Sequence, residues 1–344
     1  MPHRARRGPP SPTGSTAPST GASAVRTGPA AAPASRRFPP APEQRAAGAR
    51  AACDHHGVPL RDPRTGRRRG RLPAPDPVVV AGADAWAGPP ALHGPRVGAL
   101  LLHGFTGSPA SVRPWGEALA SAGLHVAVPR LPGHGTSVAE LDRTTWRDWY
   151  ALARADLLSL RERCDVVVVG GLSMGGALAL RLAVHEAASV DALALVNPAV
   201  LLGDPRLAAL PLLRLLRRDV PGVADDIVLE GRTEVGYDRV PLRALSSFVG
   251  LMAGVRAELP RVEQPLLVAS SAHDRVVPPR SAALVRSATS SRDVRDVRLP
   301  RSGHVATLDH DAPVVVAETL RLARHVAASA GATSRGSTAA GAVA

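Results

Sequence analysis

The stretch Gly171-Leu172-Ser173-Met174-Gly175 has the pattern Gly-x-Ser-x-Gly and decides the fold class. The apolar, valine-rich run 165–170 before it predicts a buried strand, and the Ala/Leu-rich run 176–185 after it predicts a helix. Strand, sharp turn and helix are the setting of a nucleophile elbow, and a Cβ at either glycine would clash with its neighbours there. A chance loop in a chain with 32 glycines is the alternative, which the flanks disfavour.

Outward from the elbow, residues 77–330 alternate between strand-like and helix-like segments. Strands are predicted at 78–80, 97–102, 125–129, 166–169, 192–196, 266–270 and 294–299, and helices at 111–122, 146–163, 176–186, 279–287 and 312–328. This alternation predicts an α/β domain with a mostly parallel sheet and helices on both faces.

The alternation breaks once, between Pro198 and Gln264. No strand is predicted there, only two helical pieces at 207–216 and 240–258. An insertion of this size usually covers the carboxyl ends of the strands, where active sites form. We therefore expect a small helical lid at about 199–263.

A serine nucleophile needs a base to take its proton and an acid to orient that base, in the chain order Ser, Asp or Glu, His. Asp274 fits the acid because it follows the strand at 266–270 and precedes a helix. Asp293 and Asp296 fit less well, since they lie at or within the next strand. A helix-capping or turn aspartate is the structural alternative for Asp274.

His304 fits the base because it follows the last predicted strand, between small residues that let its ring reach out of a loop. His310 and His325 are competitors, at the start of the last predicted helix and inside it. Most single histidines are surface or core residues, so the case for His304 depends on the order in which Ser173 and Asp274 precede it.

An oxyanion hole requires backbone N–H groups that point at the reacting carbonyl oxygen. Met174 offers one, because it follows the serine and opens a helix whose N-terminus carries partial positive charge. Phe105 offers the other, from the loop after the strand 97–102. An ordinary turn is the alternative for this loop.

The net charge of +13 belongs mostly to the N-terminal segment. Residues 1–75 carry 14 arginines and three acidic residues, a net charge of +11, which leaves +2 for the rest of the chain. We interpret residues 1–76 as a disordered Arg/Pro/Ala-rich tail or as the result of a start codon assigned too early, and 331–344 as a second disordered tail. The cluster at 64–71 could touch an anionic surface, but no nucleic-acid partner is expected.

Two cysteines, Cys53 and Cys164, form neither a disulfide framework nor a metal-ligand spacing, so neither a metal nor a cofactor is expected. The sequence lacks a signal-peptide pattern and an apolar run of about 18 residues. These features favour a cytoplasmic protein with at most transient contact with a membrane surface, and they leave the oligomeric state open.

Several stretches together resemble the α/β-hydrolase superfamily, and more narrowly its bacterial carboxylesterase and monoacylglycerol lipase group. They are HGFTGSP (103–109), LPGHGT (131–136), GLSMGG (171–176), GYDRVPLRALSSF (236–248), HDRVVPP (273–279) and SGHVATLD (302–309). The resemblance covers about residues 95–325. One departure is Gly303, where the family often has a bulkier residue such as Tyr, so a looser His304 loop is expected.

The resemblance implies hydrolysis of short- to medium-chain acyl esters, including monoacylglycerols, through an acyl-enzyme. Ser173 would be the nucleophile, His304 the base and Asp274 its orienter, with Phe105 and Met174 as oxyanion donors. The substrate would be a small-molecule, lipid-like ester. Two alternatives stay open: another activity of the same triad, such as thioesterase, lactonase, C–C hydrolase or acyl transferase, and a non-catalytic ligand-binding protein.

Overall fold

The computed structural model of the chain describes residues 85–87, 95–204, 207, 209–223 and 225–340. The strand expected at 78–80 and the N-terminal tail expected at 1–76 lie outside the described residues. The last helix, α8, is Ala312–Ala340, whereas the sequence predicted a helix end at residue 328 and a tail from 331. Within the described part of the chain, no helix is long and apolar enough to cross a bilayer.

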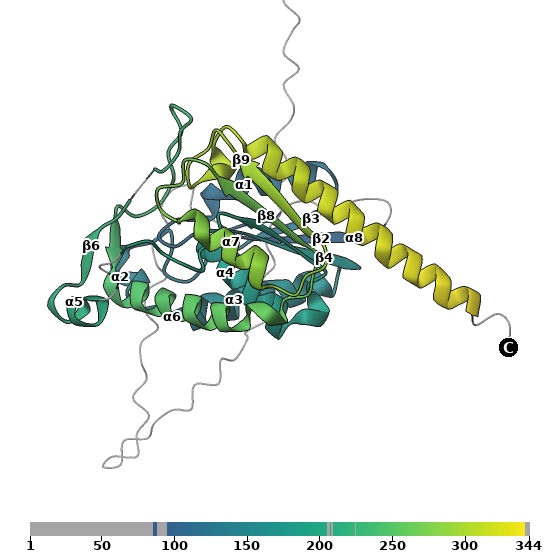
Figure 1. Ribbon diagram of the computed structural model, residues 1–344, viewed down its shortest axis with the longest axis horizontal. Coiled ribbons are helices and arrows are strands. Elements are labelled where there is room, and N and C mark those ends of the chain that lie inside the picture. The colour runs from purple at the N-terminus through teal and green to yellow at the C-terminus, as the bar shows by residue number, and fades with distance from the viewer. Residues whose placement is uncertain (1–84, 88–94, 205–206, 208, 224, 341–344) are drawn as a thin grey trace, which may run out of the picture. The chain divides into compact units, whose positions relative to one another are not determined.

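A seven-stranded sheet with the order β1-β3-β2-β4-β5-β8-β9 forms the centre of the described chain (Figure 1). Its strands are β1 Trp86–Ala87, β2 Val97–Leu102, β3 His125–Val128, β4 Val166–Leu172, β5 Ala192–Val196, β8 Leu266–Ser271 and β9 Val294–Leu299. Strand β1 is antiparallel to β3, and every other pair in the sheet is parallel. The predicted mostly parallel sheet is therefore confirmed.

Both faces of the sheet are covered by helices, because successive strand residues point to opposite faces. Val166 and Val168 pack in a core with α1 (Arg113–Ser121) and α8, and Val167 and Val169 pack in a second core with α3 (Trp146–Arg161), α4 (Met174–His185) and α7 (Pro279–Ala288). Because both faces of β4 are covered, its four consecutive residues 166–169 are all valine and do not alternate with polar residues. The four-residue helix α2 (Val138–Leu141) was not predicted; Ser137 caps it by accepting the Glu140 N–H.

The expected lid region holds α5 (Leu210–Leu216) and α6 (Leu242–Glu258). It also holds two short strands, β6 (Asp219–Pro221) and β7 (Arg239–Pro241), which pair antiparallel. The expectation of a lid without strands was therefore wrong. Three-residue strands that contain proline have too few alternating side chains to produce a sequence signal.

The sheet order places a topological switch point beside the elbow. From β2 the chain runs outward to β3 on one side and then returns to β4 on the other, so the loops after β2 and β4 leave in opposite directions. The pairing of Leu102 with Gly171 ends both strands at the same level. The Phe105 loop and Ser173 are thereby brought to one edge of the sheet.

Candidate active site

Ser173 lies at the turn between β4 and α4 in a strained backbone conformation, with φ 56° and ψ −115°. The glycines on either side permit this turn. A Cβ on Gly171 would lie 2.2 Å from the Gly175 carbonyl carbon, and a Cβ on Gly175 would lie 2.0 Å from the Leu102 oxygen. Real Cβ atoms do not approach backbone this closely, so the geometry of the turn requires glycine at both positions.

His304 and Asp274 form a close pair, although 30 residues separate them in sequence. His304 Nδ1 lies 2.8 Å from Asp274 Oδ2, and both side chains are nearly buried, with 9% and 5% exposure. The other carboxylate oxygen, Oδ1, accepts the backbone N–H groups of Val276 (2.8 Å) and Val277 (2.7 Å). These bonds fix the carboxylate so that it can hold the imidazole in the tautomer with hydrogen on Nδ1.

Ser173, Asp274 and His304 line one cavity of about 900 Å³. Within the described chain Ser173 Oγ makes no hydrogen bond with His304; such bonds are often long in the absence of substrate. The lid supplies most of the apolar wall, from residues that include Leu210, Leu213, Val240, Leu242, Leu245 and Phe248.

Phe105 lines the same cavity as Ser173, and Met174 follows Ser173 as the first residue of α4. Neither backbone N–H donates a hydrogen bond to another of the described residues. Gly104 lets the Phe105 loop approach the serine, since a Cβ on Gly104 would lie 3.4 Å from Ser173 Cβ. Both N–H groups can therefore donate to a ligand in the cavity, and their role as oxyanion donors stays a prediction.

The alternative candidates for the acid and the base lie outside the cavity that contains Ser173. Asp293 pairs with His325 at 3.2 Å, and Asp296 pairs with Arg286 at 3.1 Å, all on the surface except the half-buried arginine. His310 precedes α8, and its backbone N–H donates to Asp309. None of these residues lines the cavity that contains Ser173.

A family model described as "Alpha/beta hydrolase family" matches residues 99–319, which is more than half of the chain. The chain belongs to this family. Within it, the chain is 39% identical over 253 residues to the thermostable monoacylglycerol lipase of Bacillus sp. (strain H-257), covering 72% of this chain and 97% of that protein. It is also 26% identical over 219 residues to the carboxylesterase of Bacillus subtilis (strain 168), covering 63% of this chain and 87% of that one.

Solved structures of lipolytic enzymes are also similar to this chain. One described under "LipS and LipT, two metagenome-derived lipolytic enzymes" has a TM-score of 0.69 and 38% identity, and the match covers 72% of this chain and all of that one. A soluble variant of the monoglyceride lipase of Saccharomyces cerevisiae matches with a TM-score of 0.60 but 15% identity, which shows a shared fold alone.

Two buried histidines, His103 and His134, lie next to the Phe105 loop of this α/β-hydrolase, and the sequence indicated no role for either of them. His103 Nε2 accepts the Leu131 N–H at 3.2 Å, so Nδ1 carries the hydrogen and donates to the Gly104 carbonyl at 2.9 Å. Burial lowers the pKa of His103 to about 4, opposed by the Gly104 bond. Burial also lowers the pKa of His134. His103 is thus a neutral residue that anchors the loop.

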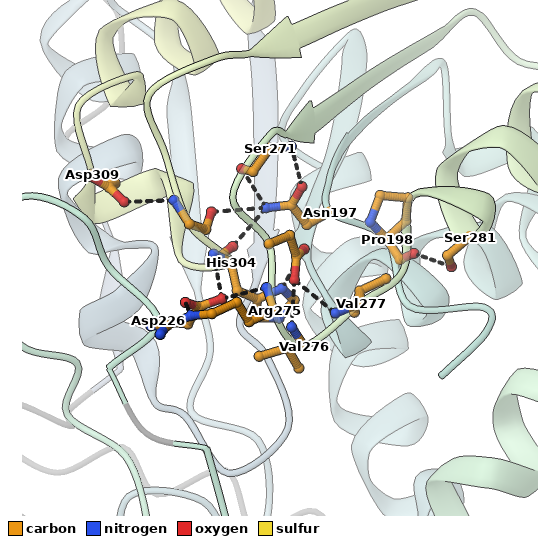
Figure 2. Close-up of polar contacts among 12 residues, drawn as sticks. Asn197, Pro198, Asp226, Ser271, Arg275, Val276, Val277, Ser281, His304 and Asp309 are labelled. Atoms are coloured by element: carbon orange, nitrogen blue, oxygen red, sulfur yellow. Dashed lines mark hydrogen bonds and ion pairs between the residues drawn. The ribbon is translucent and has the colours of Figure 1, made fainter. Parts of the chain in front are cut away.

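The loop that carries His304 is held by residues that sequence reasoning missed. Asn197, which follows β5 in a positive-φ conformation, donates to the His304 carbonyl at 2.7 Å and also bonds Ser271 (Figure 2). The Gly303 N–H donates to Asp309 at 2.8 Å, so the loop that was expected to be looser has a backbone hydrogen bond at this glycine. Asn197 directly after a predicted strand was the one local signal that could have indicated a role here.

Glu234, a partly buried residue, adds a carboxyl group to the lining of the cavity. Burial raises the pKa of Glu234, although the charge of His304 and a hydrogen bond from Ser111 oppose this. The cavity thus has an apolar wall from the lid and a polar group near His304.

Proposed function

We propose that the protein is a serine carboxylesterase that hydrolyses short- to medium-chain acyl esters, monoacylglycerols among them. The observation that carries the proposal is the strained Ser173 in one cavity with the 2.8 Å His304–Asp274 pair. The match to a monoacylglycerol lipase over nearly that protein's whole length adds support.

The geometry supports an acyl-enzyme mechanism. Ser173 Oγ attacks the ester carbonyl carbon while His304 Nε2 takes the hydroxyl proton, and Asp274 stabilises the resulting imidazolium. The Phe105 and Met174 N–H groups receive the negative oxygen of the tetrahedral intermediate. When the intermediate collapses, His304 returns the proton to the leaving alcohol. Water, activated by the same histidine, then releases the carboxylic acid and restores Ser173.

The shape of the cavity favours an amphiphilic substrate. The lid leucines and Phe248 would bury an acyl chain, because burial of each methylene contributes about 0.8 kcal/mol. Glu234 and Thr106 offer acceptors for free hydroxyl groups of a polyol alcohol. A monoacylglycerol has both parts.

Substitution of Ser173 by alanine tests this function. We expect Ser173→Ala to lower kcat on p-nitrophenyl butyrate by at least about 10⁴-fold and to abolish labelling by a fluorophosphonate probe, with the melting temperature kept. Ser121→Ala, at the exposed end of α1, is the matched control and keeps full activity. The assignment fails if Ser173→Ala retains hydrolysis.

A comparison of monoacylglycerols with ethyl esters of the same acids tests the preference for a polyol alcohol. Equal kcat/KM for the two kinds of ester would contradict that preference.

A further inference from the structure

Asp226 is a buried carboxylate of the lid, 3% exposed, in the segment between β6 and β7. We infer that Asp226 is a positioning residue that holds the His304 and Asp274 loops in their reactive arrangement. This inference rests on the proposed ester hydrolysis at Ser173. Nothing in the local sequence around Asp226 marks it, because its partners lie about 50 and 80 residues further along the chain.

Asp226 contacts both loops with one carboxylate (Figure 2). Its Oδ2 accepts the backbone N–H of His304 at 3.1 Å and the backbone N–H of Arg275, the neighbour of Asp274, at 2.9 Å. Its own carbonyl oxygen accepts the Val305 N–H at 3.1 Å. One lid residue therefore fixes the backbone on which the base stands and the backbone next to the acid.

The backbone bonds, more than the charge, carry this role. Asp226 Oδ1 accepts Arg275 Nε at 2.7 Å, but the arginine side chain is 73% exposed and free to turn toward water. An ion pair with so exposed a partner contributes little. The two backbone N–H donors have no such freedom, and a buried carboxylate without them would be strongly unfavourable.

A second carboxylate, that of Asp309, also connects the His304 loop to the lid. Asp309, on the His304 loop, accepts the N–H groups of Val228 and Leu229 in the lid at 2.7 and 2.9 Å, together with that of Gly303. Burial alone would raise the pKa of Asp309, but its four backbone hydrogen bonds hold the pKa below the ordinary value. A Cβ on Gly303 would lie 2.5 Å from the Asp226 carbonyl oxygen, so the lid backbone approaches the His304 loop closely at this glycine.

This arrangement makes the reactive geometry depend on the lid. The direction of the His304 ring follows its backbone, and a displacement of about 1 Å at a catalytic group can lower the rate about 100-fold. Loss of the Asp226 carboxylate should therefore act on kcat more than on KM.

Three substitutions of Asp226 separate geometry from charge. Asp226→Asn keeps an oxygen that can accept both backbone N–H groups, and its kcat on p-nitrophenyl butyrate should stay within about threefold of the wild type. Asp226→Glu keeps the charge but displaces it by one methylene, and Asp226→Ala removes the acceptor; both should lose roughly 10- to 100-fold in kcat with KM nearly unchanged. Asp219→Ala, at a surface ion pair with Arg239 in the same lid, is the control and keeps kcat.

The assay is run well below each melting temperature, so that a purely structural role would leave kcat unchanged. Wild-type kcat in a folded Asp226→Ala enzyme would overturn the inference. If Asp226→Ala does not fold, the other two variants decide. Asp226→Glu as active as Asp226→Asn would show that the position of the carboxylate does not set kcat, which also overturns the inference. An inactive wild type would instead overturn the proposed hydrolase function and this inference with it.

Discussion

At the scale of single residues, the elbow excludes a side chain at Gly175. We expect Gly175→Ala to lower the free energy of unfolding by at least about 2 kcal/mol and to lower esterase activity, because its Cβ would lie 2.0 Å from the Leu102 oxygen. Urea denaturation followed by tryptophan fluorescence measures the loss.

Gly250→Ala is the matched control for that substitution. Gly250 lies inside α6, where the nearest atom to a new Cβ is 4.0 Å away. Alanine should leave stability unchanged or raise it by up to about 1 kcal/mol, because alanine has the higher helix propensity. Equal losses in the two variants would contradict the steric account of the elbow.

The candidate site residues that directly follow a strand could be predicted from the sequence. Ser173, Asp274 and His304 each follow a predicted strand, and the structure places all three around one cavity. Asp226 was not predictable, since it belongs to an irregular lid segment and gains its meaning from N–H groups of distant loops. Almost every residue has a backbone N–H group. A carboxylate that binds backbone N–H groups therefore does not require a particular residue type at its partner positions, and the sequence cannot reveal the pair.

At the scale of elements, the strands of the parallel sheet from residue 97 onward were predicted to within three residues at each end. The central strands β2, β4, β5 and β8 are runs of mostly apolar residues that are buried on both faces, whereas the edge strand β9 alternates charged and apolar residues and is half exposed. The short elements β1, α2, β6 and β7 were missed. Each has two to four residues, too few to display a period of 2 or 3.6. The lid fold depends on such elements, so its substrate contacts could not be derived from sequence.

The lid helix α6 should set the preferred acyl length. Leu245 lines the cavity, so Leu245→Trp should fill part of its volume. We expect kcat/KM for decanoyl and dodecanoyl esters to fall at least about tenfold, while that for acetyl esters changes little, because only the longer chains need the filled space. Ala253→Trp, on the exposed side of the same helix, is the control. A uniform loss for all chain lengths would contradict this role for Leu245.

At the scale of the whole molecule, five strand ends of one sheet carry the groups of the site. Phe105 follows β2, Ser173 follows β4, Asn197 follows β5, Asp274 follows β8 and His304 follows β9. The sheet therefore acts as the frame that holds the groups of the site in place. A change that weakens the interior behind the Phe105 loop should consequently appear in the unfolding of the entire described domain.

Buried His103 makes this global stability depend on pH. Burial lowers its pKa in the folded protein to about 4, from an ordinary value of 6.5. Between these values the unfolded chain binds a proton that the folded protein does not, so the contribution is fully present above pH 6.5 and is lost as the pH falls toward 4. The loss amounts to about 3 kcal/mol.

His103→Gln should therefore be less stable than the wild type at pH 7, through its lost bonds to Gly104 and Leu131, yet less sensitive to acid. Urea denaturation at pH 7, 6, 5 and 4.5 should show the gap in free energy of unfolding narrowing by roughly 2–3 kcal/mol toward the lowest pH. Ser121→Ala, which changes an exposed side chain that does not titrate, provides the control, with a constant gap. A His103→Gln gap that stays constant or widens in acid would contradict a neutral, buried His103.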